Sequence, residues 1–209
     1  MAMTKEEERA LRQEAATPWD FFTQVSRRFR FNVDVAASIR NHKCHTFITE
    51  KQNALAPEAW VQTVGCLPAG QQILTQSDLG RLHFWCNPPF KTMQPWVEKM
   101  CQEVMRTPGS VGVMLGPTSN APWLTEFCYR TADSIEPIYP RVQLIPPEGI
   151  TYSTNMCDQV LIVWRYRPDF AYVAPDRNDH RAVWRPYRWT PEAKPKKRGK
   201  NGQQQTEDD

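Results

Sequence analysis

Apolar positions along the chain follow two periods, which predict helices and strands in alternation. Apolar side chains at helical spacing predict one helix over 93–105 and another over 121–130. An earlier helix is predicted to begin with Thr17 as its N-cap and Pro18 as its first helical residue. Alternating or continuous apolar runs predict strands at 31–35, 46–50, 82–86, 111–115, 134–139, 142–145 and 159–164.

The order of these elements predicts an α/β fold. Strands and helices alternate first, and strands follow one another closely at the end. This order favours a mostly parallel sheet, flanked by helices, with an antiparallel edge. Residues 61–80 are interrupted by Gly and Pro, and their apolar positions show only weak periodicity, so we expect a loop excursion there. A length of 209 residues fits one domain, which we place at 16–184 between a charged N-terminal segment, 1–15, and a tail, 185–209.

The charge of the chain is concentrated in this tail. The net charge is +3, yet residues 185–200 hold seven Lys and Arg against the single acid Glu192. Residues 201–209 carry three acids, so residues 1–184 sum to about zero, and the body of the protein is not a general polyanion binder. We expect a disordered tail that either holds DNA phosphates nonspecifically or is only a solvated end. Its candidate phosphate contacts are Lys194, Lys196, Lys197 and Arg198.

Nothing in the sequence indicates a membrane or an oxidising compartment. No apolar run approaches the ~20 residues needed to cross a bilayer, and the N-terminus lacks the hydrophobic region of a signal peptide. Six cysteines are scattered without a C-x-x-C pair, which favours reduced core thiols over disulfides. We therefore expect a cytoplasmic protein without a membrane partner.

The local run His42-Lys43-Cys44-His45 raises the question of a zinc site. A structural zinc site needs four ligands, usually in two spaced pairs, and the sequence offers no second pair with that spacing. We therefore predict no metal.

The run Asn87-Pro88-Pro89-Phe90 is the strongest candidate for chemistry. Two prolines cannot continue a central strand, so a rigid loop follows the strand predicted at 82–86. In open α/β sheets, ligands bind outside the carboxyl ends of the strands. The Asn87 side-chain oxygen and the Pro88 carbonyl are two acceptors for one NH₂ group, and Phe90 offers a flat face for a base. A Pro-Pro turn without function is the alternative.

Three segments in chain order resemble the phage-type Dam-like N6-adenine DNA methyltransferases. They are Thr17-Pro18 at a helix start, Asp34-Val35-Ala36-Ala37 at the end of a strand, and the Asn-Pro-Pro-Phe run. The resemblance covers roughly residues 17–164 and extends to Asn41, Lys43-Cys44, Trp85-Cys86, Trp96 and Pro140-Arg141-Val142. The chain departs from the family pattern at Pro140, where Gly is usual.

The resemblance implies a Rossmann-like fold that binds S-adenosylmethionine and delivers its methyl group to N6 of adenine in DNA. It implies catalytic roles for Asn87, Pro88, Pro89 and Phe90. The residues that it places at the cofactor are Thr17, Pro18, Asp34, Ala36, Ala37, Asn41 and Glu50. A solvated loop carboxylate explains Glu50 equally well. Lys91 and Arg141 are the candidate DNA contacts outside the tail.

Two other functions remain open. The same acceptor pair serves the N4 amine of cytosine, although Ser-Pro-Pro is commoner in cytosine enzymes. A nucleic-acid-binding protein that keeps the fold without turnover is the other alternative. The resemblance also implies a phage or prophage gene expressed in the cytoplasm of a bacterial host, and it leaves open whether the protein is a monomer or a dimer.

Overall fold

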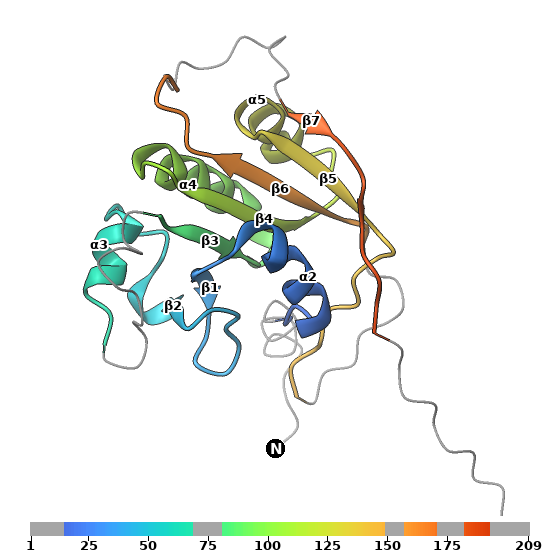
Figure 1. The fold of residues 1–209 in the computed structure, drawn as a ribbon, viewed down its shortest axis with the longest axis horizontal. Coiled ribbons are helices and arrows are strands. Elements are labelled where there is room, and N and C mark those ends of the chain that lie inside the picture. The colour runs from blue at the N-terminus through green and yellow to red at the C-terminus, as the bar shows by residue number, and fades with distance from the viewer. Residues whose placement is uncertain (1–14, 69–80, 149–156, 171–181, 193–209) are drawn as a thin grey trace, which may run out of the picture.

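The computed structural model describes residues 15–68, 81–148, 157–170 and 182–192 of the chain (Figure 1). They form an eight-stranded sheet of order β2-β1-β3-β4-β6-β5-β7, with β8 paired to β5. The strands are β1 (Val33–Ala37), β2 (Thr46–Thr49), β3 (His83–Cys86), β4 (Val111–Pro117), β5 (Ser134–Tyr139), β6 (Gln159–Arg165), β7 (Val183–Trp184) and β8 (Tyr187–Arg188). The helical elements are α2 (Trp19–Phe29), η1 (Glu50–Gln52), α3 (Trp60–Gly65), η2 (Phe90–Thr92), α4 (Met93–Arg106), η3 (Trp123–Cys128) and α5 (Tyr129–Thr131). Within these ranges, the structure has no helix of the length and apolar character that a membrane crossing requires.

The sheet is parallel from β2 to β4 and antiparallel around β6. β1 pairs in parallel with both β2 and β3, and β3 pairs in parallel with β4. β6 runs antiparallel to β4 and β5, whereas β7 and β8 are parallel to β5. The predicted α/β class with a mostly parallel sheet is confirmed. The antiparallel strand lies inside the sheet, not at its edge, because β5 and the C-terminal strands extend the sheet beyond β6.

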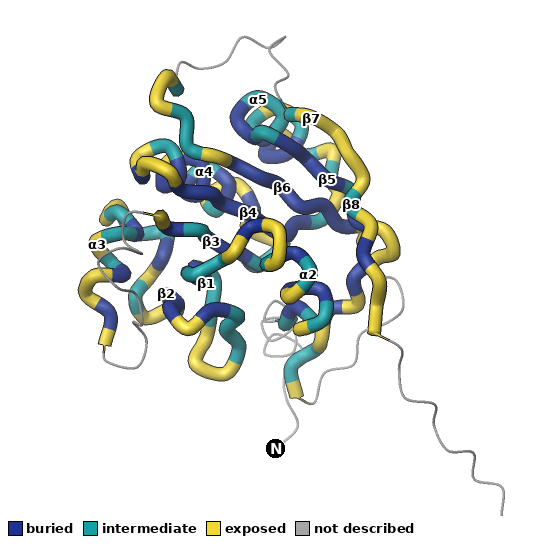
Figure 2. Tube along the Cα trace, in the orientation of Figure 1, coloured by how far each residue is buried: buried dark blue, intermediate teal, exposed yellow. Residues whose placement is uncertain are grey.

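Helices cover both faces of the sheet and create two hydrophobic cores (Figure 2). Alternate residues of β3 serve the two faces: Phe84 belongs to the core under α3 and α4, and Trp85 to the core under α2. β4 is buried along almost its whole length, as its unbroken apolar run predicts. At Gly112 it approaches α4 so closely that a Cβ atom would lie 2.7 Å from Val104 Cγ2, which explains a glycine inside a buried strand.

The loop expected over 61–80 begins instead with a helix. Residues Trp60–Gly65 form α3, and the buried carboxylate of Glu103 on α4 accepts the N–H of Trp60 at 2.8 Å. The free N–H groups at a helix start need acceptors, and here one comes from another element. The local sequence pattern does not indicate this helix, because the residue that caps its start, Glu103, lies far along the chain. Residues 69–80 lie outside the described part.

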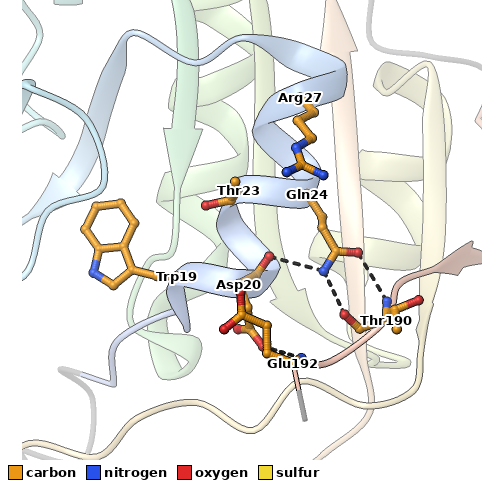
Figure 3. Close-up of a pocket in the computed structure, with 7 residues that line it drawn as sticks. All are labelled: Trp19, Asp20, Thr23, Gln24, Arg27, Thr190 and Glu192. Atoms are coloured by element: carbon orange, nitrogen blue, oxygen red, sulfur yellow. Dashed lines mark hydrogen bonds between the residues drawn. The ribbon is translucent and has the colours of Figure 1, made fainter.

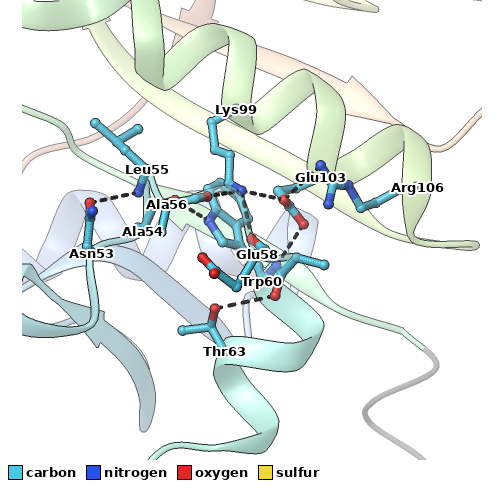
Figure 4. A network of polar contacts seen from close by, with 11 residues as sticks. Asn53, Ala54, Leu55, Ala56, Glu58, Trp60, Thr63, Lys99, Glu103 and Arg106 are labelled. Atoms are coloured by element: carbon cyan, nitrogen blue, oxygen red, sulfur yellow. Dashed lines mark hydrogen bonds and ion pairs between the residues drawn. The ribbon is translucent and has the colours of Figure 1, made fainter.

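A buried lysine completes the contact between α4 and the segment before α3 (Figure 4). Lys99 Nζ lies 2.9 Å from Glu103 Oε1 and donates to the carbonyls of Ala56 and Glu58 at 2.6 and 2.8 Å. Burying a charge is tolerated only when it is paired and hydrogen-bonded, and both conditions hold for Lys99. The network fixes residues 56–60 on α4.

The strand predicted over 142–145 is not formed. The side-chain amide of Gln159 takes the place of a neighbouring strand, because its Oε1 accepts the N–H of Val142 and its Nε2 donates to the Val142 carbonyl. Only Ile145 makes a strand-like contact, an isolated antiparallel bridge with Ala16. Residues 142–145 are thus held in an extended conformation without the regular hydrogen bonds of a β-strand.

Helix α2 begins at Trp19, later than the sequence predicts. Pro18 occupies the N-cap position in an extended conformation, with φ −60° and ψ 143°, and Thr17 makes no capping hydrogen bond. The predicted N-cap role of Thr17 is therefore wrong. The helix predicted over 121–130 is present, as the π-helical turn η3 followed by α5.

The folded chain extends into the range that the composition assigns to a tail, 185–209. Arg185 Nε donates to the buried carboxylate of Glu136 at 2.8 Å, and Trp189 is buried against α2. The basic composition of this stretch does not show that Arg185 and Trp189 pack against the domain. The tail therefore begins later than residue 185, where the sequence places it. Residues 193–209 lie outside the described part, as does 1–14, and the domain boundaries otherwise remain predictions.

Candidate functional site

The carboxyl ends of β1, β2 and β3 meet at one edge of the sheet, and the predicted motifs lie there. These strands are parallel neighbours, so the loops that follow them leave from the same edge. Asp34 of β1 is in register with Trp85 of β3. Ala36 lies two residues farther along β1, and Asn87 lies two residues beyond Trp85, directly after the end of β3. The register therefore brings the two motifs to neighbouring positions at this edge.

Asn87 is held by the chain segment before α2. Its Nδ2 donates to the Ala15 carbonyl at 2.8 Å, which leaves Oδ1 as the group that faces away from that segment. Among the described residues, neither Asn87 Oδ1 nor the Pro88 carbonyl accepts a hydrogen bond. The Pro89 carbonyl is occupied, because it accepts the N–H of Thr92. The two acceptors expected from the sequence therefore have no hydrogen-bond donor within the described part of the chain.

Phe90 lies at the start of η2, directly after the prolines. Its ring is partly buried and packs against both hydrophobic cores. The core fixes the ring while part of it stays accessible beside Asn87. Such a ring is a rigid platform on which a planar base can stack.

Asp34 is a buried carboxylate that braces the turn after β1. Its Oδ2 accepts the N–H of Lys43 at 2.8 Å, and its Oδ1 accepts the N–H of Ala36 at 3.3 Å. Burial raises the pKa of Asp34 to about 7, although the hydrogen bonds from Lys43 and Ala36 and the Lys43 charge act in the opposite direction. A cation beside this carboxyl would favour its charged form. Ala37 ends the strand and is partly exposed.

Thr17 lies between the loops that follow β3 and β1. Ala15, two residues before it, contacts Asn87, and Trp19, two residues after it, carries Lys43 Nζ at 4.3 Å from its ring centroid. The Thr17 side chain is 1% exposed, and its hydroxyl has no hydrogen-bond partner among the described residues. An unpaired buried polar group costs about 1–3 kcal/mol, so this hydroxyl is suited to a ligand.

Two buried polar groups therefore fit a polar cationic cofactor at this edge. The Thr17 hydroxyl offers an unused hydrogen-bonding atom, and the Asp34 carboxyl gains from a positive neighbour. Pro18 is partly exposed beside them. The residues present thus match the chemistry of S-adenosylmethionine, which carries a sulfonium and an ammonium group.

The other two predicted cofactor residues lie at the same edge with less defined surroundings. The backbone of Asn41 closes a tight turn with Ser38 through hydrogen bonds in both directions. Glu50 follows β2 as the first residue of η1 and is exposed. Their contacts with a cofactor remain predictions.

Two contacts at this site have no counterpart in the sequence pattern. The first is the hydrogen bond from Asn87 to the Ala15 carbonyl, which is a backbone group and so cannot be predicted from a pattern of side chains. Helical spacing predicts a core position for Trp19 in α2, yet this residue is 56% exposed and lies beneath Lys43. The neighbouring Asn41, Lys43 and Cys44 belong to the family resemblance, and this is the only available signal for a functional loop.

A surface pocket of about 400 Å³ lies between α2 and the C-terminal segment and contains none of the predicted site residues (Figure 3). Gln24 bonds both the carbonyl and the N–H of Thr190 there, and the N–H of Glu192 donates to Asp20. These bonds attach the C-terminal segment to α2. The pocket lining is Trp19, Asp20, Thr23, Gln24, Arg27, Thr190 and Glu192.

The predicted DNA contacts are dispersed. Lys91 is exposed in η2, next to Phe90. Arg141 is ion-paired with Asp158, with Nη2 2.6 Å from Oδ1. The four tail residues proposed for phosphate binding lie outside the described part of the chain: Lys194, Lys196, Lys197 and Arg198.

The described residues contain no group of three or more His, Cys, Asp and Glu that could hold a metal ion. His42 stacks on Phe47 at 4.1 Å, and Cys44 is buried with its pKa raised well above the usual value by burial and by the nearby Asp34. These contacts explain the His-Cys run as packing.

Comparison with known proteins gives one family match. The family described as DNA N-6-adenine-methyltransferase (Dam) matches residues 2–181. This range includes the carboxyl ends of β1, β2 and β3 and the loops that follow them. No curated protein matches the chain.

Proposed function

The chain belongs to the DNA N-6-adenine-methyltransferase (Dam) family, and on this premise we propose that it transfers a methyl group from S-adenosylmethionine to N6 of adenine in DNA. The observation that carries the proposal is the orientation of Asn87. Its N–H is donated to Ala15, so its Oδ1 and the Pro88 carbonyl remain as two adjacent acceptors.

Two acceptors suit an exocyclic amine for a chemical reason. The lone pair of the adenine amine is delocalised into the ring, which makes the nitrogen a weak nucleophile. Acceptors that bind both of its hydrogens favour a tetrahedral nitrogen and stabilise the transition state more than the ground state. Asn87 and Pro88 perform this role, and Phe90 holds the base in plane.

The donor side of the proposal rests on Thr17 and Asp34. S-adenosylmethionine supplies an activated methyl group on a sulfonium, so the protein needs no metal and contributes positioning. The Thr17 hydroxyl gains the partner that it lacks, and the cofactor's positive charge favours ionised Asp34. Ala36 and Ala37 are small residues that permit close approach of the cofactor, with Pro18, Asn41 and Glu50 around it.

The strand order supports a Rossmann-like fold. Parallel β2, β1, β3 and β4 are followed by the antiparallel β6, and ligands of open α/β sheets bind at the carboxyl ends of such strands. One connection differs from an alternating pattern: β1 leads to β2 through a loop without a helix, whereas helices follow β2, β3 and β4. That loop carries Asn41 and Lys43.

Methyl transfer to duplex DNA requires that the adenine leave the helix, because its amine is otherwise in the groove wall. The exposed Lys91 next to Phe90 is suited to a phosphate beside the extruded base, and Arg141 is a weaker candidate because Asp158 already pairs with it. The basic tail adds nonspecific affinity.

The direct test is identification of the product. Unmethylated duplex DNA is incubated with the protein and isotope-labelled S-adenosylmethionine, digested to nucleosides and analysed by chromatography with mass detection. We expect label in N6-methyladenine. Label in N4-methylcytosine would assign the cytosine reaction, and absence of label together with absence of cofactor binding would indicate a non-catalytic binding protein.

The Asn87→Ala variant tests the acceptor role within the same assay. We expect loss of methyl transfer, with cofactor affinity by calorimetry within severalfold of the wild type, because Thr17 and Asp34 are untouched. Lys51→Ala, an exposed change in η1, is the matched control and should retain activity. Turnover by Asn87→Ala at the wild-type rate would remove Asn87 from the reaction.

A further inference from the structure

We propose that the Ala15 carbonyl is a positioning group that sets which end of the Asn87 side-chain amide faces the substrate amine. The inference rests on the proposed function and adds to it a residue that no sequence pattern indicates. Its basis is the 2.8 Å hydrogen bond from Asn87 Nδ2 to the Ala15 carbonyl.

The need for such a group follows from the symmetry of the amide. Rotation about the last side-chain bond of asparagine exchanges an acceptor for a donor in nearly the same volume. With the NH₂ group outward, Asn87 would present a donor to an amine that is itself a donor, and the methyl acceptor would be repelled. The Ala15 carbonyl accepts only from the NH₂ end, so it holds Oδ1 outward.

Ala15 is itself fixed by a short segment that we call the Ala15–Pro18 strap. The N–H of Ala16 donates to the Ile145 carbonyl, and the N–H of Ile145 donates to the Ala16 carbonyl, both at 2.8 Å. Ile145 belongs to the extended segment that the Gln159 side chain holds at Val142. The Ala15 carbonyl therefore has a rigid support on β6.

A backbone ester tests the contact without changing a side chain. Replacing Ala16 by lactic acid turns the Ala15 carbonyl into an ester carbonyl, which is a weaker acceptor, and removes the Ala16 N–H. The matched control is the corresponding hydroxy acid at Ile145, which removes the other bond of the same bridge and leaves the Ala15 amide intact. The two esters thus weaken the strap equally, and only one weakens the acceptor of Asn87.

The expected result is a split between turnover and binding. The ester at residue 16 should lower kcat about tenfold or more, with the KM for DNA and the Kd for S-adenosylmethionine within about threefold. The ester at residue 145 should lower kcat several times less. Equal losses in the two esters, or a loss confined to KM, would overturn the inference.

Asn87→Asp gives an independent readout through pH. A charged carboxylate places an oxygen against the Ala15 carbonyl, whereas the protonated acid donates its O–H there and keeps an outward acceptor. We therefore expect the activity of Asn87→Asp relative to wild type to rise as pH falls from 8 to 5.5. A ratio that is flat or falls toward acid would contradict the role of Ala15.

Other titrating groups near Asn87 are shared by both proteins. Among the described residues these are Asp34 on the neighbouring strand, Lys43 beside it, Cys86 directly before Asn87, and Lys91 in η2. Asp34 titrates within the assay range, so only the ratio of the variant to wild type is informative. Failure of the wild type to methylate adenine would refute the proposed function. A methylating wild type with parallel pH profiles would refute this inference alone.

Discussion

Asp34→Asn should make the cofactor-free protein more stable at alkaline pH while it weakens cofactor binding. Burial raises the pKa of Asp34 from its ordinary value of 3.8 to about 7. Between these values the folded protein binds a proton that the unfolded chain has released. The free energy of unfolding therefore falls as pH rises across this window, and the loss is complete above pH 7.

The size of the effect follows from the width of the window. Each pKa unit corresponds to about 1.4 kcal/mol, so the full loss approaches about 4 kcal/mol, of which about a third is already lost at pH 5. Asparagine resembles the protonated acid because it is neutral. Its oxygen can accept the Lys43 N–H, whereas its NH₂ cannot accept the Ala36 N–H, so the weaker bond at 3.3 Å is lost at every pH. The free energy of unfolding of the variant minus that of the wild type should therefore increase by about 2–3 kcal/mol between pH 5 and pH 8.

Urea unfolding followed by circular dichroism at pH 5, 6.5 and 8 measures the difference. The difference between the free energies of unfolding of the two proteins at each pH cancels the contribution of every other titrating group that does not interact with residue 34. Glu50→Gln, which removes an exposed carboxylate at the end of the next strand, is the control for the loss of an acidic side chain. A stability difference between wild type and Asp34→Asn that stays constant from pH 5 to 8 would refute the reasoning.

The same carboxyl predicts pH-dependent cofactor binding under the proposed function. A cationic cofactor favours the ionised form, so wild-type affinity should rise through pH 7 and binding at pH 6.5 should release protons. Calorimetry in buffers of different ionisation enthalpy detects that release. Asp34→Asn should bind more weakly and release none.

Three further predictions concern packing and charge. Glu136→Gln should cost about 1–3 kcal/mol at pH 7, because Arg28 and Arg185, which are themselves partly exposed, lose the charged acceptor to which both donate. Burial alone would raise the pKa of Glu136, but hydrogen bonds from Arg28, Ser134 and Arg185 lower it, so this cost should shrink as pH falls below 4.5 toward the folded-state pKa. Glu103→Gln should lower the melting temperature by leaving the Lys99 charge unpaired. The double change to Lys99→Met with Glu103→Gln removes that charge and keeps an acceptor for the Trp60 N–H, so it should recover part of the loss. Truncation after Glu192 should weaken DNA binding mainly at low salt, and an unchanged salt slope would exclude the tail from the interface.

The parallel core of the fold is predictable because its strands carry their own signal. Val111–Pro117 is buried on both faces, and an unbroken apolar run is what such a strand requires. The elements that the sequence pattern misses depend on partners far along the chain. The start of α3 takes its cap from Glu103, and the 142–145 segment takes its hydrogen bonds from Gln159. Neither partner shows in a local window.

The candidate site divides along the same line. Asp34 and Asn87 stand at ends of strands in motifs with recognisable residues, so the sequence alone predicts that they meet at one edge. The orientation of Asn87 depends on the Ala15 carbonyl, and an interaction through the backbone leaves no trace in residue identity. Lys43 illustrates the intermediate case, because its side chain belongs to the pattern but its backbone N–H supports Asp34.

The Ala15–Pro18 strap connects the two halves of the proposed site. Its Ala15 carbonyl accepts from Asn87, the residue that we propose binds the base, and its Thr17 hydroxyl, two residues on, is the unpaired group that we propose binds the cofactor. A cofactor that engages Thr17 therefore acts on the same short backbone that aims Asn87. The strap is hydrogen-bonded to Ile145 through Ala16 and continues into α2 after Pro18. A movement of Thr17 would therefore be passed on only within residues 15–18. Under the proposed function, one short segment would therefore couple the positions of methyl donor and methyl acceptor, which is what an in-line transfer between two bound molecules requires.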